Sequence, residues 1–297
     1  NEGGNNISLN MLLLTGQYNL KWSRQINDKN HLVISNFIVQ EQNTNLGARK
    51  IIPNAILHEG NISMYFESRL NKSFILEYGI GGGEKLIVTR LTPSLNDEKK
   101  IIHPFNKFSP YYTIYSGLTW YERKHFNLKF NVANGVRIPN LAELSSNGLH
   151  EGTFVYEVGN PSLKNEQLYS SNLYLNYTSK NINVILSPFY NHYKNFVYLN
   201  PGNEFDKWYG FPKAYYVQKD VNQYGVEFNI ITSLFTTYSI SLKGSGMRSK
   251  TYKGEFTPYT PAIKLTPSIN GIIKTTILPV GFFISSDFVL AQNETST

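Results

Sequence analysis

The stretch Phe126–Tyr177, which reads FNLKFNVANGVRIPNLAELSSNGLHEGTFVYEVGNPSLKNEQLYSSNLYLNY, decides the fold of this chain. Apolar residues occupy every second position from Phe126 to Val132, and polar residues occupy the positions between them. A period of two is typical of a strand whose two faces meet different surroundings. The alternation breaks at Gly135 and resumes at Leu168. The stretch therefore predicts a strand, a long polar and glycine-rich loop, and a returning strand.

The loop between these two strands carries two motifs, Gly-Val-Arg-Ile-Pro before Glu-Leu and Gly-Asn-Pro-Ser-Leu-Lys-Asn-Glu. Their motif residues are Gly135, Arg137, Pro139, Glu143, Leu144, Gly159, Asn160, Pro161, Leu163 and Glu166. The pair of motifs resembles the barrel of TonB-dependent outer-membrane receptors. In that family a Gly-aromatic-Arg-Ala-Pro run precedes Glu-Leu, and Gly-Asn-Pro-x-Leu-Lys-Pro-Glu opens the next strand. This chain departs from the pattern at Val136, Ile138 and Asn165, which are mild changes of size and stiffness.

The resemblance implies an all-β fold, an antiparallel transmembrane β-barrel with long extracellular loops and short periplasmic turns. We count about thirteen strands, whereas plugged transporters close at about twenty-two. Residues 1–297 are therefore predicted to be one partial barrel domain from the middle-to-late barrel, without the plug and the final strands. Such a fragment is expected neither to close nor to transport by itself.

The same resemblance implies a function. A receptor of this family in the outer membrane of a Gram-negative bacterium binds a scarce nutrient such as an iron-siderophore complex, haem or a metal ion. It imports that nutrient with energy from the TonB–ExbB–ExbD complex, which acts through the plug. The implied partners are this complex, outer-membrane lipid with lipopolysaccharide, and the small ligand. Neither an enzyme activity nor a cofactor is predicted.

Composition limits the alternatives. Hydrophobic residues make up 41% of the chain, and no stretch approaches the roughly eighteen consecutive apolar residues of a spanning helix. Strands of a membrane barrel alternate lipid-facing and lumen-facing residues, so an average hydropathy is compatible with one. The absence of cysteine removes disulfides and thiol chemistry. The net charge of +7 comes with scattered lysines and no nucleic-acid motif, so nucleic acid is not a predicted partner.

Several element predictions follow from the pattern along the chain. Residues 7–15 and 18–22 are expected to be two strands around a turn at Gly16, and residues 196–213 a long loop. The Gly81-Gly82-Gly83 run lacks the spacing of a phosphate-binding loop and is predicted to be a flexible or bulged strand segment. No segment of useful length shows the helical period.

Two groups of loop side chains are candidates for chemistry. His150 lies beside Glu151 and Glu157, and a neutral imidazole with carboxylates is a possible ligand set for a divalent metal. A solvated loop histidine is the commoner role for such a residue. Arg137 is expected to pair with a carboxylate of the barrel wall, with Glu143 and Glu166 as the natural partners. No local spacing indicates a catalytic triad or an acid–base pair of carboxylates.

Two other readings remain at this point. One is a barrel of another kind, a plugless porin or an adhesin, which lacks a plug in its upstream coding sequence. The other is a soluble β-sandwich that binds carbohydrate, which requires two stacked sheets with a dry core between them. The loop motifs and the high content of aromatic residues, with 21 Tyr and 18 Phe, argue against the sandwich.

Overall fold

A computed structural model shows the arrangement of the chain. It describes residues 9–47, 50–93, 101–122, 125–150, 152–207, 210–235 and 237–292, so the first residues of the predicted strand at 7–15 and the candidate ligand Glu151 lie outside the described residues. In these ranges no helix has the length and apolar character needed to cross a membrane.

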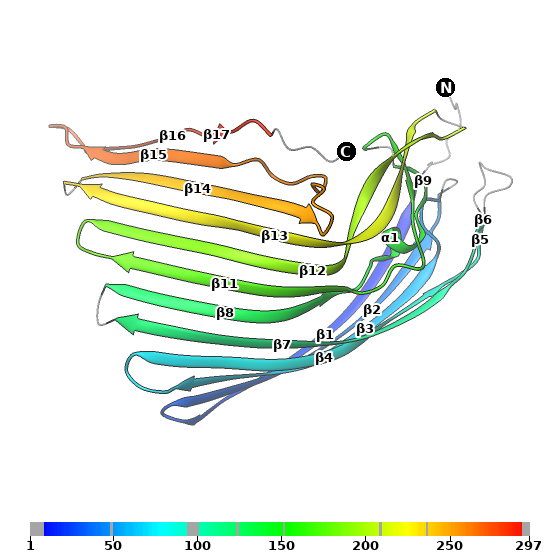
Figure 1. The fold of residues 1–297 in the computed structure, drawn as a ribbon, viewed down its shortest axis with the longest axis horizontal. Helices are drawn as coiled ribbons and strands as arrows, with labels where there is room; N and C mark the ends of the chain where they lie inside the picture. The colour runs from blue at the N-terminus through cyan, green and yellow to red at the C-terminus, as the bar shows by residue number, and fades with distance from the viewer. Residues whose placement is uncertain are drawn as a thin grey trace.

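Twelve long strands follow one another in a single sheet, and each pairs antiparallel with the next one along the path. They are β1 (Met11–Asn27), β2 (Asn30–Asn45), β3 (Ala55–Arg69), β4 (Phe74–Thr89), β7 (Asn106–Glu122), β8 (Phe126–Arg137), β11 (Glu166–Thr178), β12 (Ile182–Phe205), β13 (Pro212–Leu234), β14 (Tyr238–Thr251), β15 (Lys264–Ile273) and β16 (Val280–Ser285). Among the described residues the end strands β1 and β16 do not pair with each other, so the sheet is a partial barrel that is not closed. Figure 1 shows that this sheet is strongly curved.

Short elements lie off this path. They are β5 (Thr92–Pro93), β6 (Ile101–Ile102), α1 (Leu141–Ser145), β9 (Asn147–His150), β10 (Val155–Val158) and β17 (Phe288–Val289). The strands β9 and β10 form a hairpin within the β8–β11 connection, and β10 also pairs in parallel with the start of β13. This connection is therefore joined to a strand far from it in sequence.

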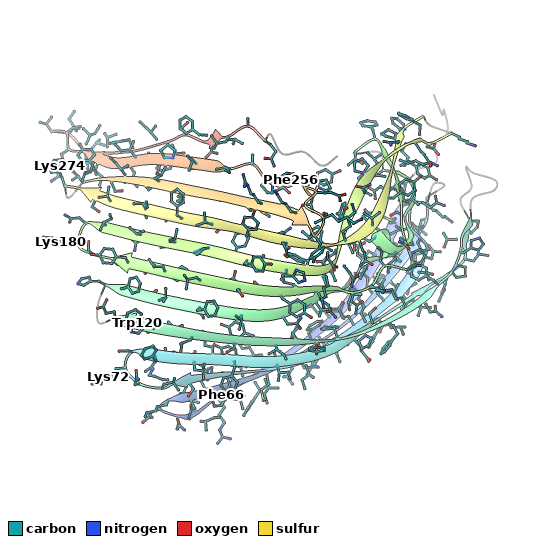
Figure 2. The ribbon with its side chains drawn as sticks, viewed as in Figure 1. Phe66, Lys72, Trp120, Lys180, Phe256 and Lys274 are labelled. Atoms are coloured by element: carbon teal, nitrogen blue, oxygen red, sulfur yellow. The ribbon has the colours of Figure 1, made fainter. Side chains whose placement is uncertain are left out.

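The two edges of the sheet differ, as the resemblance to a membrane barrel predicts. Tight turns join β1 to β2, β3 to β4, β7 to β8, β11 to β12 and β13 to β14 at one edge. The long connections after β2, β4, β8 and β14 lie at the opposite edge, together with α1 (Figure 1). Lys72, Lys180 and Lys274 mark the short-turn edge in Figure 2, and Phe256 lies toward the long-loop edge.

The register of β8 on β11 explains the alternation in the sequence. Phe130 lies opposite Leu173 and Leu128 opposite Leu175, so apolar side chains share one face, while Asn131 lies opposite Asn172 on the other. We call the face that carries α1 the inner face. On it Glu77 of β4 accepts a hydrogen bond of 2.5 Å from Tyr65 of β3. The inner face is thus polar where the outer face is apolar.

Two element predictions are wrong. The residues predicted as two strands around Gly16 form one strand, because Gly16 pairs with Gln40 without any break in register; twelve long strands therefore replace the thirteen expected. The predicted loop at 196–213 is mostly strand, because β12 and β13 continue past the sheet as a two-stranded arm. Register shifts after Tyr193 and after Pro201 hide this arm from a period-two search.

Other predictions are settled by the topology. The segment at Gly81-Gly82-Gly83 is strand, as expected, but it pairs on both sides without a bulge. The short helix α1 was not anticipated. A β-sandwich is wrong for this chain, because the long strands form one continuous curved sheet rather than two stacked ones.

Candidate functional site

The helix α1 begins with a reciprocal cap that its sequence specifies. The Glu143 backbone N–H donates to Asn140 Oδ1 at 2.9 Å, and the Asn140 backbone N–H donates to Glu143 Oε2 at 2.8 Å. This capping box satisfies two backbone donors that a helix start leaves free. Pro139 precedes it and is fully buried. The first motif therefore ends β8 and starts a helical turn.

The apolar side of α1 packs on the inner face of the sheet. Leu141 and Leu144 contact wall residues from β3, β4 and β12, and Leu144 is completely buried. We call this cluster the loop core; its buried residues are Ala55, Leu57, Ile87, Leu141, Leu144, Leu163 and Val197. It joins strands that are separated along the sheet, so the β8–β11 connection folds back onto the wall.

Arg137 holds this connection from the end of β8. Its guanidinium donates to both oxygens of Glu143, at 2.8 and 2.9 Å, and to both oxygens of Glu166, at 3.3 and 3.0 Å. Both carboxylates are largely buried, whereas the Arg137 side chain is 42% exposed. The expected pairing thus forms with both partners at once. A planar fork with five donors is the group that can bind two carboxylates in this way.

Glu166 has a second role that the sequence did not reveal. Its Oε2 accepts the backbone N–H of Val197 at 2.9 Å. Val197 follows the register shift of β12 after Tyr193, where a ladder hydrogen bond is interrupted. The carboxylate therefore supplies the acceptor for a buried backbone donor, which is costly to leave unpaired.

The second motif closes the connection against α1. The Gly159 N–H donates to Ser146 O at 2.6 Å and the Asn160 N–H to Glu143 O at 2.8 Å. A Cβ on Gly159 would lie 2.4 Å from the Ser145 backbone nitrogen, so glycine is required by close approach. Leu163 is buried in the loop core.

For two motif residues, Gly135 and Pro161, the structure shows neither a close approach nor burial that requires the residue type. Gly135 faces only an ordinary contact with Leu168 at 3.7 Å. Pro161 is exposed at the start of its turn.

The candidate metal ligands lie on the β9–β10 hairpin. His150 is exposed and its Nδ1 lies 3.2 Å from Thr153 Oγ1. Glu157 is buried and accepts a hydrogen bond of 2.9 Å from the Tyr216 hydroxyl. Among the described residues no three His, Asp, Glu or Cys side chains come together as a metal site. Because Glu151 lies outside these residues, the metal site stays a prediction.

Tyr216 lies on the arm of β13 beyond the end of the wall. Burial first, and then its hydrogen bond to Glu157, raise the pKa of this tyrosine above its ordinary value. Its neighbour Gln218 binds the connection as a backbone strand would, accepting from Lys164 N at 2.8 Å and donating to Lys164 O at 2.7 Å. Sequence reasoning missed both residues, because their partners are more than fifty positions away.

The assembled site is a folded connection at the long-loop edge, fixed to the inner wall by one dry core and one charged cluster. Apart from Gly135, which lies in β8, the motif residues hold this connection or lie within it. Its geometry places a short helix on the inner face of the curved sheet and joins a hairpin to the start of β13. The site has the form of a lining of the inner face.

Comparison with known proteins identifies the family. A family model described as "TonB dependent receptor-like, beta-barrel" matches residues 86–271. Among solved structures, the chain is similar to the copper transporter OprC, with a TM-score of 0.76 and 13% identity over 96% of this chain and 45% of that one. No curated protein matches the sequence.

The chain is also similar to two further solved structures. The haemophore receptor HasR of Serratia marcescens, solved with HasA and haem, has a TM-score of 0.68 and 11% identity over 93% of this chain and 51% of its own. The ferric yersiniabactin receptor FyuA of Yersinia pestis has a TM-score of 0.63 and 13% identity over 95% of this chain and 43% of its own. The chain thus spans about half of these receptors or less. It belongs to the TonB-dependent receptor family and forms part of its β-barrel.

Proposed function

We propose that this chain is part of the barrel wall of an outer-membrane receptor that imports a scarce nutrient with energy from TonB. The observation that carries the proposal is the β8–β11 connection folded onto the inner face and held there by Arg137. A connection packed inside narrows the opening of a barrel. A narrowed opening suits a receptor that binds its cargo and releases it under control better than an open pore.

The cargo class follows from the similar structures, whose names refer to copper, ferric yersiniabactin and haem. We propose an iron-siderophore complex, haem or a metal ion as the nutrient. The TonB–ExbB–ExbD complex is the proposed source of energy, acting through a plug domain. The proposed location is the outer membrane of a Gram-negative bacterium, with lipopolysaccharide around the wall. The family consists of transport receptors, so we propose no enzyme activity.

The test is uptake by cells that lack the gene. A deletion strain is supplied in turn with labelled ferric siderophores, haem and copper as the only source of each metal. Uptake of one of them is expected to fall, to return with the intact gene, and to stay absent when TonB is inactivated. Uptake that continues without TonB would instead support the alternative of a plugless porin.

A further inference from the structure

A hollow lies on the inner face beside the folded connection. Its volume is about 570 Å³, within the usual range for a small-molecule site. The floor comes from β1, β2, β3 and β4, and the first residues of the α1 turn form one side. It therefore depends on the same docked helix as the site described above, but none of the motif residues lines it.

One part of the hollow is apolar. Its apolar residues are Met11, Leu13, Val39, Ile52, Leu57 and Leu141. Met11 and Leu13 are about half exposed, as all of the edge strand β1 is exposed, and they place apolar side chains on an inner face that is polar elsewhere. An apolar patch of this kind gains free energy when a ligand or partner covers it.

The other part of the hollow is acidic. Glu59 pairs with Lys85 at 3.0 Å. Glu41 lies on the neighbouring strand in a diagonal position, because it pairs with Leu57 while Val39 pairs with Glu59. Among the residues that the structure describes, the Glu41 carboxylate has no hydrogen-bond or ion-pair partner. Two carboxylates and one ammonium leave a net negative charge.

We propose that this hollow binds a small amphipathic molecule that carries one cationic group, such as a primary amine or a guanidinium. The cationic group pairs with Glu41, and the apolar body covers Met11, Leu13 and Val39. Pairing in a partly enclosed hollow is less screened than at an open surface. Binding in this hollow requires no energy from TonB, so the proposal goes beyond the proposed import function.

The experiment measures equilibrium binding to the full-length receptor in nanodiscs of zwitterionic lipid. The probe is dansylcadaverine, a dansyl ring on an alkyl amine, whose fluorescence rises in apolar surroundings. Dansylglycine carries the same ring on a carboxylate and tests the role of charge. Empty nanodiscs give the background.

Saturable binding of the amine probe is expected, with much weaker binding of dansylglycine. Glu41→Gln is expected to weaken the amine roughly tenfold, which corresponds to about 1.4 kcal/mol. Glu41→Asp keeps the charge and is expected to restore most of the affinity. Val39→Trp fills the hollow and is expected to abolish binding of the amine.

The matched control is Glu227→Gln, the same change in another hollow of about 410 Å³ that β12, β13, β14 and β15 line. It is expected to leave the affinity unchanged. The proposal is overturned if wild type does not bind the amine, if dansylglycine binds equally well, or if Glu41→Gln and Glu227→Gln weaken binding alike. Intact amine binding with failed nutrient uptake would count against the import function alone.

Discussion

Arg137 is the residue on which the folded connection depends most directly. It neutralises Glu143 and Glu166, which are largely buried and each also accept a backbone N–H. Arg137→Ala leaves these carboxylates facing each other without a counter-charge. Because hydrogen bonds to charged groups are worth about 1.5–3 kcal/mol, we expect a loss of that order in the free energy of unfolding. Denaturant unfolding of the full-length receptor measures it.

A matched variant separates this effect from the general loss of an arginine. Arg90 is exposed near the same edge of the sheet, and Arg90→Ala is expected to change the unfolding free energy by less than about 0.5 kcal/mol. Arg137→Lys should lie between the two, because an ammonium cannot bind both carboxylates with a fork. Equal stability of Arg137→Ala and Arg90→Ala would show that the cluster contributes nothing.

Gly159 gives a second prediction at this scale. Its missing side chain allows the chain to pass over the last turn of α1, where a Cβ meets backbone nitrogens at 2.4 and 2.5 Å. Backbone cannot move aside as a flexible side chain can, so Gly159→Ala is expected to cost about 1–3 kcal/mol. Gly60→Ala adds the same methyl group in open space and is the control. A thermal midpoint that is the same for both variants would contradict this account.

Some side-chain contacts of the site could be predicted from the sequence and others could not. The pairing of Arg137 with nearby carboxylates was predictable, because fork geometry and opposite charge limit its partners. The use of Glu166 by Val197 was not, since it depends on a register shift in β12. The pairing of Glu157 with Tyr216 joins residues 59 positions apart and leaves no local signal.

At the scale of elements, α1 acts as the apolar anchor of the connection. Leu144 is completely buried in the loop core. Leu144→Ala removes most of a buried side chain and leaves a cavity, which costs about 2–5 kcal/mol. We expect protease cleavage within residues 138–165 to become faster while the sheet stays intact. Leu91→Ala, at a residue that is 59% exposed, should leave the cleavage rate unchanged.

The contact between the hairpin and the arm predicts a dependence on pH. The pKa of Tyr216 is raised, so the folded state holds its proton more tightly than the unfolded chain does. The stability that Tyr216 contributes to the folded state is complete below pH about 10, the ordinary pKa of tyrosine, and is lost as the pH rises above that value. Cleavage of the β9–β10 hairpin by an alkaline protease should therefore accelerate between pH 9 and pH 11.

Tyr216→Phe tests the cause of this dependence. The variant leaves buried Glu157 without its donor, which costs about 1–3 kcal/mol, so cleavage should be fast already at pH 9 and change little above it. Tyr252→Phe alters a tyrosine that is 84% exposed and should behave as wild type. If both variants accelerate between pH 9 and pH 11 as wild type does, another group is responsible.

The long strands could be predicted from the sequence, whereas the arm and the helix α1 could not, and each case has a physical reason. Strands such as β8 and β11 were predictable, because each has one polar and one apolar face. The arm of β12 and β13 was not, because the register shifts after Tyr193 and after Pro201 break the period of two. The helix α1 is too short for periodicity, although Asn140 and Glu143 carry the capping-box signature that indicates a helix start.

At the scale of the whole molecule, the sheet has two unlike faces and two unlike edges. The outer face is apolar along adjacent strands, the inner face carries the polar groups and the folded connection, and tight turns occupy a single edge. A sheet in water needs a covered apolar face and tolerates a polar one. Here the covering on the outer side is expected to be lipid, because the chain's own helix lies on the inner side.

Adjacent residues of β1 test this assignment at the same depth. Leu20 shares the outer face with Tyr18 and Trp22, and Asn19 points to the inner face; both side chains are exposed in the described sheet. A lysine near the middle of the lipid-facing band costs about 2–4 kcal/mol, so Leu20→Lys should lower the folded fraction of full-length receptor assembled into lipid vesicles. Asn19→Lys places the same charge in the wet interior and should assemble as wild type. Equal yields, scored as heat-modifiable protein, would mean that the outer face does not meet hydrocarbon.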